Sequence, residues 1–335
     1  MIGSGTSRRQ LYGAAILGLM ATCLMAMPAS AQGTKPEVVA TIAMIADVAR
    51  NVAGDCADVQ ALMGSGVDPH LYRASANDVR TFEQADAIFY SGYSLEGQLG
   101  DVLKQLGKQK PTVAVSPTAI GPADLIAVQD LYGIDPHLWM DASLWGRTAP
   151  VIADTLGKLA PDCASAMRDR AAGYQGQLEA LHGWIKESVA TIPQGQRILV
   201  TAHDAFNYYG RAYGIEVAGI QGISTESEAG VADVRAMVDV VAERKVPAVF
   251  VESTINPRTI QAVIDGAKQR GQTVKIGGQL YSDAMGEAGK AGGTYIGMMF
   301  ENTSTIVEAL GGRPVALPQA LRGWAERWKI DVAAK

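Results

Sequence analysis

The sequence carries the tripeptide Asp-Pro-His twice, at residues 68–70 and 135–137. Only four histidines occur among the 335 residues, and a third, His203, lies in Ala-His-Asp at 202–204. Imidazole is the commonest protein ligand for transition metals, and a neighbouring proline stiffens the loop that presents it. His70, His137 and His203 are 67 and 66 residues apart, far wider than in a zinc finger. The spacing predicts a metal site that the fold assembles.

The elements that must position these histidines are short apolar segments alternating with segments of helical periodicity. The predicted strands are 38–42, 59–63, 87–90, 112–115, 197–201, 215–218, 248–251 and 274–276. Continuous apolar strands separated by helices are typical of parallel sheets covered by helices on both faces. We therefore expect an α/β fold with two similar four-stranded parallel-sheet domains.

One long helix is predicted between the two sets of strands, at about 162–188. This segment has no proline, and its apolar residues recur at steps of three and four: Met167, Ala171, Tyr174, Leu178, Leu181 and Ile185. A helix of this length is a rod of about 40 Å. We therefore expect an N-terminal lobe at 32–160, a rigid linking helix at 161–190 and a C-terminal lobe at 191–335.

The predicted elements bring the histidines to one place. In open α/β sheets, ligands bind in the crevice outside the carboxyl ends of the strands. His70 and His203 each follow a predicted strand, and His137 lies just before a helix predicted to open near residue 142. The corresponding loop after strand 274–276 offers Asp283 as a fourth, oxygen ligand.

Other roles for the same residues stay open at this point. Each histidine alone fits an ordinary loop residue bonded to a carbonyl, and Asp68 and Asp135 are alternative ligands if Asp283 is a turn residue. Asp204 is expected to cap a helix. Glu252 either holds a histidine ring or is a strand-end charge. His182 is expected on the surface of the long helix, partly buried and not a ligand.

The first 31 residues have the pattern of a secretory signal. Arg8 and Arg9 precede an apolar run at 11–27 and the cleavage box Ala-Ser-Ala at 29–31, which predicts a cut after Ala31. An uncleaved anchor and a twin-arginine signal are the alternatives. Cys23 is not expected to be lipidated, because Thr22 precedes it where small residues are required.

Charge and cysteine content bound the partners of the mature chain. Removing residues 1–31 takes the formal net charge from −5 to −7, which argues against nucleic acid and anionic membrane surfaces as partners. Cys56 and Cys163 remain, and in an oxidising compartment they either form a disulfide or stay as two buried thiols.

The motifs together resemble the TroA-like, cluster A-I metal receptors. The resemblance runs from about residue 38 to 310 and includes Gly-Val-Asp-Pro-His at 66–70, Asp-Pro-His-Leu-Trp at 135–139, Thr-Ala-His-Asp-Ala-Phe at 201–206 and Ser-Asp-Ala-Met-Gly at 282–286. Arg-Ala-Tyr-Gly at 211–214 and Gly-Thr-Tyr at 293–295 agree as well. The resemblance implies the ligands His70, His137, His203 and Asp283, two lobes and a rigid helical spine.

It also implies a function, which is the capture of one Zn²⁺ or Mn²⁺ ion per chain outside the cytoplasm and its delivery to the membrane permease of an ABC importer. We expect no enzyme activity, no membrane insertion of the mature chain, a periplasmic location and a monomer. Three imidazoles and a carboxylate suit tetrahedral zinc, yet both metals stay open. Affinity is expected to drop as pH falls through about 6.5, the ordinary histidine pKa. The alternative is a secreted zinc-dependent hydrolase.

Overall fold

The structure is a computed structural model that describes residues 1–3, 34–128 and 133–331. Residues Lys35–Lys335 form one compact unit. Most of the predicted signal segment, including the twin-arginine pair, Cys23 and the cleavage box, lies outside the described residues. Among the helices of the described part, none combines the length and the apolar character that crossing a membrane requires.

The first half of the chain is built on a parallel sheet with the strand order β2-β1-β3-β4. Its strands are β1 (Glu37–Ile42), β2 (Asp58–Met63), β3 (Ala87–Tyr90) and β4 (Thr112–Ala114). In the register, Val39 pairs with Gln60 on one side and with Ile88 on the other. The central strand β1 is buried from Val38 to Ile42, as a continuous apolar run between two neighbours requires.

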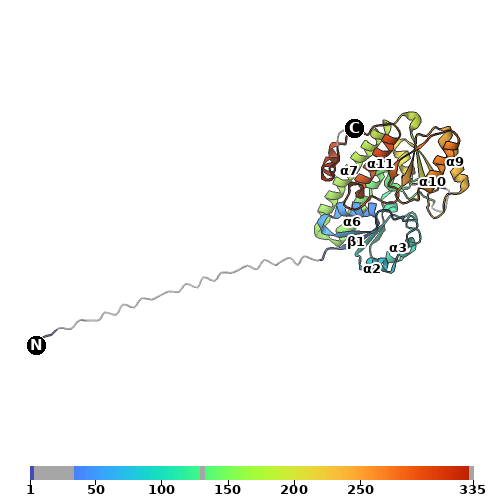
Figure 1. Ribbon diagram of the computed structural model, residues 1–335. Coiled ribbons are helices and arrows are strands. Elements are labelled where there is room, and N and C mark those ends of the chain that lie inside the picture. Colours follow the sequence, from blue (N-terminus) through green and yellow to red (C-terminus); the bar gives the residue numbers. More distant parts are fainter. Residues whose placement is uncertain (4–33, 129–132, 332–335) are drawn as a thin grey trace. The chain divides into compact units, whose positions relative to one another are not determined.

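In the described residues, the first half of the chain also contains six α-helices, some of which cover the two sides of this sheet. They are α1 (Ala43–Ala53), α2 (Ala76–Gln84), α3 (Leu99–Leu106), α4 (Val115–Ala119), α5 (Ala142–Gly146) and α6 (Thr148–Leu159). Figure 1 shows α2 and α3 on one side of β1 and α6 on the other. The first turn of α2 is fixed by a capping box, in which Ser75 and Asp78 each accept from the other's backbone N–H.

The predicted long helix is α7 (Ala164–Ala190). All six residues of its predicted apolar stripe are buried, and they belong to one core that takes in residues of both halves of the chain. Helices α1, α5 and α6 from the first half and α11 (Tyr295–Ala309) from the second half pack on α7, and Figure 1 shows α7 and α11 side by side. The helix therefore joins the two halves through shared packing. The lobe boundaries at 160/161 and 190/191 stay a prediction.

The second half contains the other four predicted strands, β5 (Ile198–His203), β6 (Glu216–Gln221), β7 (Ala248–Glu252) and β8 (Lys275–Leu280). Here the prediction of one four-stranded sheet was wrong in detail: β5 pairs with β6 and β7 pairs with β8, as two parallel ladders. Strands β5 and β7 still lie beside each other. At the ends of β5 and β7, the backbone N–H of His203 donates to the Glu252 carboxylate. A side chain there takes the place of a backbone acceptor on the neighbouring strand.

Helices also cover the second set of strands. They are α8 (Asn207–Tyr213), α9 (Val231–Glu243), α10 (Arg258–Gln269) and α11. Helix α12 (Arg322–Trp328) packs on α11 instead, where Trp324 contacts Phe300. Along β5 the side chains alternate between two cores: Ile198 and Val200 join the core under α9 and α10, and Leu199 joins the core around α7. Both faces of the strand are therefore buried, which explains its unbroken apolar sequence.

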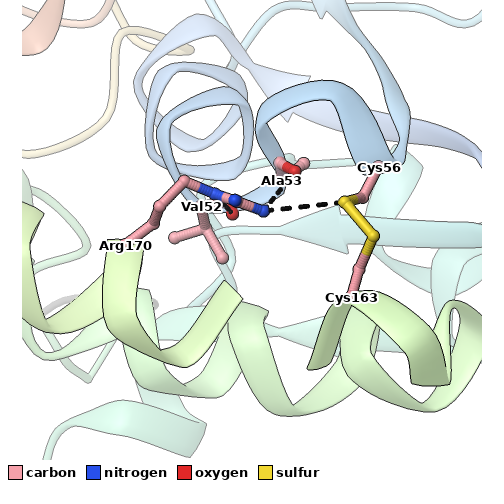
Figure 2. Close-up of a disulfide and its surroundings, with 5 residues drawn as sticks. All are labelled: Val52, Ala53, Cys56, Cys163 and Arg170. Atoms are coloured by element: carbon pink, nitrogen blue, oxygen red, sulfur yellow. Dashed lines mark hydrogen bonds between the residues drawn. A yellow bond between two sulfur atoms is a disulfide. The ribbon is translucent and has the colours of Figure 1, made fainter. Parts of the chain in front are cut away.

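Cys56 and Cys163 form a disulfide, which settles the alternative that the sequence left open. The bond connects the segment after α1 to the residue preceding α7. Arg170 of α7 lies beside it and donates to the carbonyls of Val52 (2.7 Å) and Ala53 (2.6 Å) at the end of α1 (Figure 2). A cation at a helix carboxyl end satisfies carbonyls that have no partner within the helix. The disulfide and Arg170 together fix α1 to the start of α7.

Candidate metal centre

The four predicted ligands meet at one point of the fold. His70 lies in the loop after β2, His137 lies before α5, His203 is the last residue of β5, and Asp283 follows β8. One ligand atom from each residue can be chosen so that all four atoms lie within 4.8 Å of one another. His203 was expected in a loop, but the strand continues two residues beyond the predicted end and includes it.

The distances among these atoms suit a metal ion. His137 Nε2 and His203 Nε2 are each 3.2 Å from an oxygen of Asp283, and His70 Nε2 is 3.4 Å from His137 Nε2. A tetrahedral ion with bonds of about 2.0–2.2 Å has ligand atoms about 3.3–3.6 Å apart. These three separations are close to what such an ion needs, whereas His70 Nε2 is 3.9 Å from Asp283 Oδ2 and would have to approach it.

Asp283 is buried, with 1% of its surface exposed. Its two oxygens face Nε2 of His137 and of His203 at 3.2 Å, but among the described residues no contact to them has good hydrogen-bond geometry. A buried polar atom without a partner is costly and calls for an explanation. A cation between Asp283 and the three imidazoles would satisfy both oxygens.

Two further carboxylates orient the imidazole rings from outside the cluster. Asp135 Oδ1 is 2.8 Å from Nδ1 of His137, and Glu252 Oε2 is 2.5 Å from Nδ1 of His203. The Asp135 contact is a hydrogen bond to the His137 ring, and the Glu252 contact is a close charge contact with the His203 ring. Each carboxylate holds Nδ1 of its ring and leaves Nε2 for the cluster. Glu252 therefore holds a ring, one of its two expected roles. Asp135 does the same, although the sequence suggested it only as an alternative ligand.

These charges shift the pKa values of the histidines in opposite directions. Burial lowers the pKa of His70 to about 3, with partial opposition from Asp283. Burial would also lower the pKa of His137, but Asp135 and Asp283 outweigh it and raise the pKa to about 9. Burial would likewise lower the pKa of His203, but Glu252 and Asp283 outweigh it and raise that pKa well above its usual range. In the metal-free site the neighbouring carboxylates therefore favour the protonated forms of His137 and His203.

The partner charge of these two imidazolium groups is Asp283. Burial would raise the pKa of its carboxyl group, but His203 and His137 hold that pKa well below its usual range. Without a metal ion, the protons on these two imidazoles supply the positive charge beside Asp283. An incoming ion must displace them, and the pH window expected from an ordinary histidine moves upward for His137 and His203.

The segments that carry His137 and Asp283 are bonded to each other and to α11. The indole N–H of Trp139 donates to the Ser282 carbonyl (3.0 Å), and the Tyr295 hydroxyl donates to the Trp139 carbonyl (2.6 Å). Asn302 of α11 bonds both the N–H and the carbonyl of Tyr281. These hydrogen bonds hold His137 and Asp283 on a common frame.

Two other expectations concerned residues near the cluster. Asp204 was expected to cap a helix, and this was wrong: α8 begins at Asn207, and Asp204 Oδ1 instead accepts from the N–H of Gly219 on β6. His182 was expected to lie on the helix surface or partly buried, and it is partly buried. Its ring lies against Tyr213, with centroids 5.1 Å apart, and its Nδ1 is 3.3 Å from Asp141.

Comparison with known proteins places these features in a family. The family model described as zinc-uptake complex component A, periplasmic, matches residues 38–309. The chain is 46% identical over 274 residues to the manganese-binding lipoprotein MntA of Bacillus subtilis, covering 82% of this chain and 89% of that protein. It is 44% identical over 282 residues to the zinc-binding protein TroA of Treponema pallidum, covering 84% and 91%.

A solved structure agrees with the sequence matches. The periplasmic zinc-binding protein TroA of Treponema pallidum superposes with a TM-score of 0.80 at 43% identity. The superposition covers 82% of this chain and 99% of that one. The fold described above is therefore shared along nearly the whole length of a zinc-binding protein.

Proposed function

The chain belongs to the family of the periplasmic zinc-uptake component A, and we propose that it captures a single Zn²⁺ or Mn²⁺ ion and delivers it to the permease of an ABC importer. The family match over residues 38–309 and the relatives at 44–46% identity support this role. The observation that carries it is the buried cluster of three histidines and one aspartate at the ion-sized spacing given above.

The proposed ligands are His70, His137, His203 and Asp283. Each lies at most 2% exposed, so the bound ion is removed from bulk water. Four protein ligands complete a tetrahedral zinc shell and leave no position for an activated water, which a hydrolytic zinc enzyme requires. The donor set therefore supports a receptor and gives no support to the alternative hydrolase.

The cargo is proposed as zinc, manganese or both. The relatives at 46% and 44% identity are named for manganese and zinc respectively. An imidazole-rich site binds Zn²⁺ more tightly than Mn²⁺ in the usual order of divalent affinities. Selection of manganese by this chain would therefore depend on the metal available where the site is loaded.

The mature protein acts outside the cytoplasm. We propose a periplasmic monomer with two lobes around the cluster, released by cleavage after Ala31. Relatives are named lipoproteins, so mass spectrometry of the exported chain is the direct test. A free amino terminus at Gln32 is expected, whereas a diacylated Cys23 would contradict the proposal. Light scattering should give the mass of one chain.

Release of the ion is proposed to come from local loop movement. The shared core along α7 joins both halves, so wide opening of the lobes would break apolar packing. The segments at 64–72 and 281–293 carry His70 and Asp283 and are the candidates for movement. Hydrogen exchange measured with and without metal identifies the moving segment, because its protection should rise when the ion binds.

Metal accumulation in cells tests the proposed function directly. A strain that lacks the chromosomal copy should take up less Zn²⁺ or Mn²⁺ under metal limitation, and the full chain should restore uptake. The Asp283→Ala variant, exported to the same level, should not restore it. Equal rescue by Asp283→Ala and the parent chain would refute the proposed role of the cluster.

A further inference from the structure

The two Asp-Pro-His tripeptides are built in the same way. In each, the aspartate Oδ1 accepts from the backbone N–H of the histidine at 2.9 Å. In each, Oδ2 accepts from a side chain of the second half of the chain: Thr225 Oγ1 at 2.7 Å from Asp68, and Asn207 Nδ2 at 3.1 Å from Asp135. Each aspartate thus connects a histidine of the first half to the second half.

The two connections differ in what surrounds them. Asp135 also bonds the His137 ring, and its own carbonyl accepts from the Tyr208 hydroxyl at 3.0 Å. Asp68 instead joins the backbone of His70 to Thr225, which lies in the irregular segment between β6 and α9. The Thr225 hydroxyl is therefore a contact through which the second half acts on the His70 loop.

The surroundings of the loop define where it can move. On one side the backbone of Gly97 approaches so closely that an added Cβ would lie 2.8 Å from the His70 carbonyl oxygen. On the other side a cavity of about 260 Å³ is lined by Asp68, Leu71 and Thr225. The side of Gly97 is blocked by backbone, whereas the side of the cavity leaves room for a displaced loop.

We propose that Asp68 and Thr225 form a latch that keeps His70 on the bound metal and sets the rate of metal release. The proposal rests on the proposed function, because it requires His70 to be a ligand. Thr225 is a positioning residue: it touches Asp68, and through Asp68 it fixes the His70 backbone. When the Thr225–Asp68 bond opens, the loop is free to turn toward the cavity and withdraw the imidazole.

The Thr225→Val variant removes the hydroxyl and keeps the shape of the side chain. Hydrogen bonds to charged groups are strong enough that losing one that acts in the bound state predicts metal release about tenfold or more faster. The rate is measured in stopped flow, with Zn²⁺-loaded protein mixed with excess chelator. The association rate and the content of one metal per chain should not change, because all four ligands remain.

Two controls separate the latch from a general effect of the substitution. Thr225→Ser keeps the hydroxyl and should release metal within about twofold of the parent rate. Thr259→Val makes the same change in another threonine that lines the cavity, and it should also behave like the parent. If Thr225→Val does not fold, Thr225→Ala supplies the same test.

Release from Thr225→Val at the parent rate would overturn the latch, and so would equal acceleration by Thr225→Val and Thr259→Val. Failure of the underlying function looks different, because the parent protein itself would then bind no stoichiometric Zn²⁺.

Discussion

Replacing Glu252 by Gln should weaken metal binding without removing a ligand. Glu252 contacts His203 twice: Oε2 lies 2.5 Å from the ring Nδ1, and Oε1 accepts from the backbone N–H at 2.9 Å. Its carboxylate makes the His203 ring more basic and keeps Nε2 turned toward the metal. Glutamine keeps the shape of the side chain and loses the charge.

The expected loss is about 10- to 100-fold in affinity, the range found when such carboxylate partners of metal-bound histidines are replaced. This corresponds to about 1.4–2.7 kcal/mol of binding free energy. Part of the loss is hidden near neutral pH. Glu252 also raises the pKa of His203 in the metal-free site. In the variant, His203 is therefore less protonated, and the metal has to displace a proton from fewer molecules. The ratio of parent to variant affinity should therefore grow as pH rises.

Competition with a chromophoric chelator measures this affinity at several pH values. Glu216→Gln is the matched control, since it makes the same change at an exposed ion pair with Arg244 on the surface and should bind metal like the parent. Affinity of Glu252→Gln within about twofold of the parent at every pH would refute the assigned role of Glu252.

Three further predictions follow from the site and the scaffold. Because the pKa of His137 is about 9 and that of His203 is also raised, metal binding at about pH 7 should release up to two protons, and metal affinity should rise with pH. Calorimetry in buffers of different ionisation enthalpy measures the number of protons released. Binding without proton release would contradict the raised pKa values. His203→Glu should shift preference from Zn²⁺ toward Mn²⁺, as oxygen donors suit the harder ion, and an unaltered ratio of the two affinities would argue against this. Replacing Cys56 and Cys163 by Ser should lower the free energy of unfolding by about 2–5 kcal/mol, because the bond closes a separation of 107 residues; chemical denaturation with unchanged stability would show that the bond contributes nothing.

The strands and the long helix were predictable because their apolar patterns are strong. Strand residues Val38–Ile42 are all buried, and the apolar residues from Met167 to Ile185 form one buried face of α7. The convergence of His70, His137, His203 and Asp283 followed from the rule that ligands gather at the carboxyl ends of parallel strands. The choice of Asp283 over Asp68 and Asp135 stayed open on the residues alone, and the full set of four ligands came from the resemblance to the metal receptors.

Other features depend on distances that a sequence does not contain. The Cys56–Cys163 pairing requires the end of α1 to lie against the start of α7, and the contact between Thr225 and Asp68 joins residues 157 positions apart. Asp204 was assigned to a helix cap because an aspartate often precedes a helix, but a tertiary partner on β6 competes for its side chain. Asp135 had a signal that was available: an aspartate two residues before a histidine can accept from its backbone N–H.

The metal content of the purified protein tests the central claim most directly. The chain is stripped with chelator, equilibrated with buffered Zn²⁺ or Mn²⁺ and examined by elemental analysis beside the His137→Ala and Asp283→Ala variants. The account predicts one equivalent of metal in the parent protein, and metal lost or greatly weakened in both variants. A parent without stoichiometric metal, or variants that keep the parent's affinity, would contradict it.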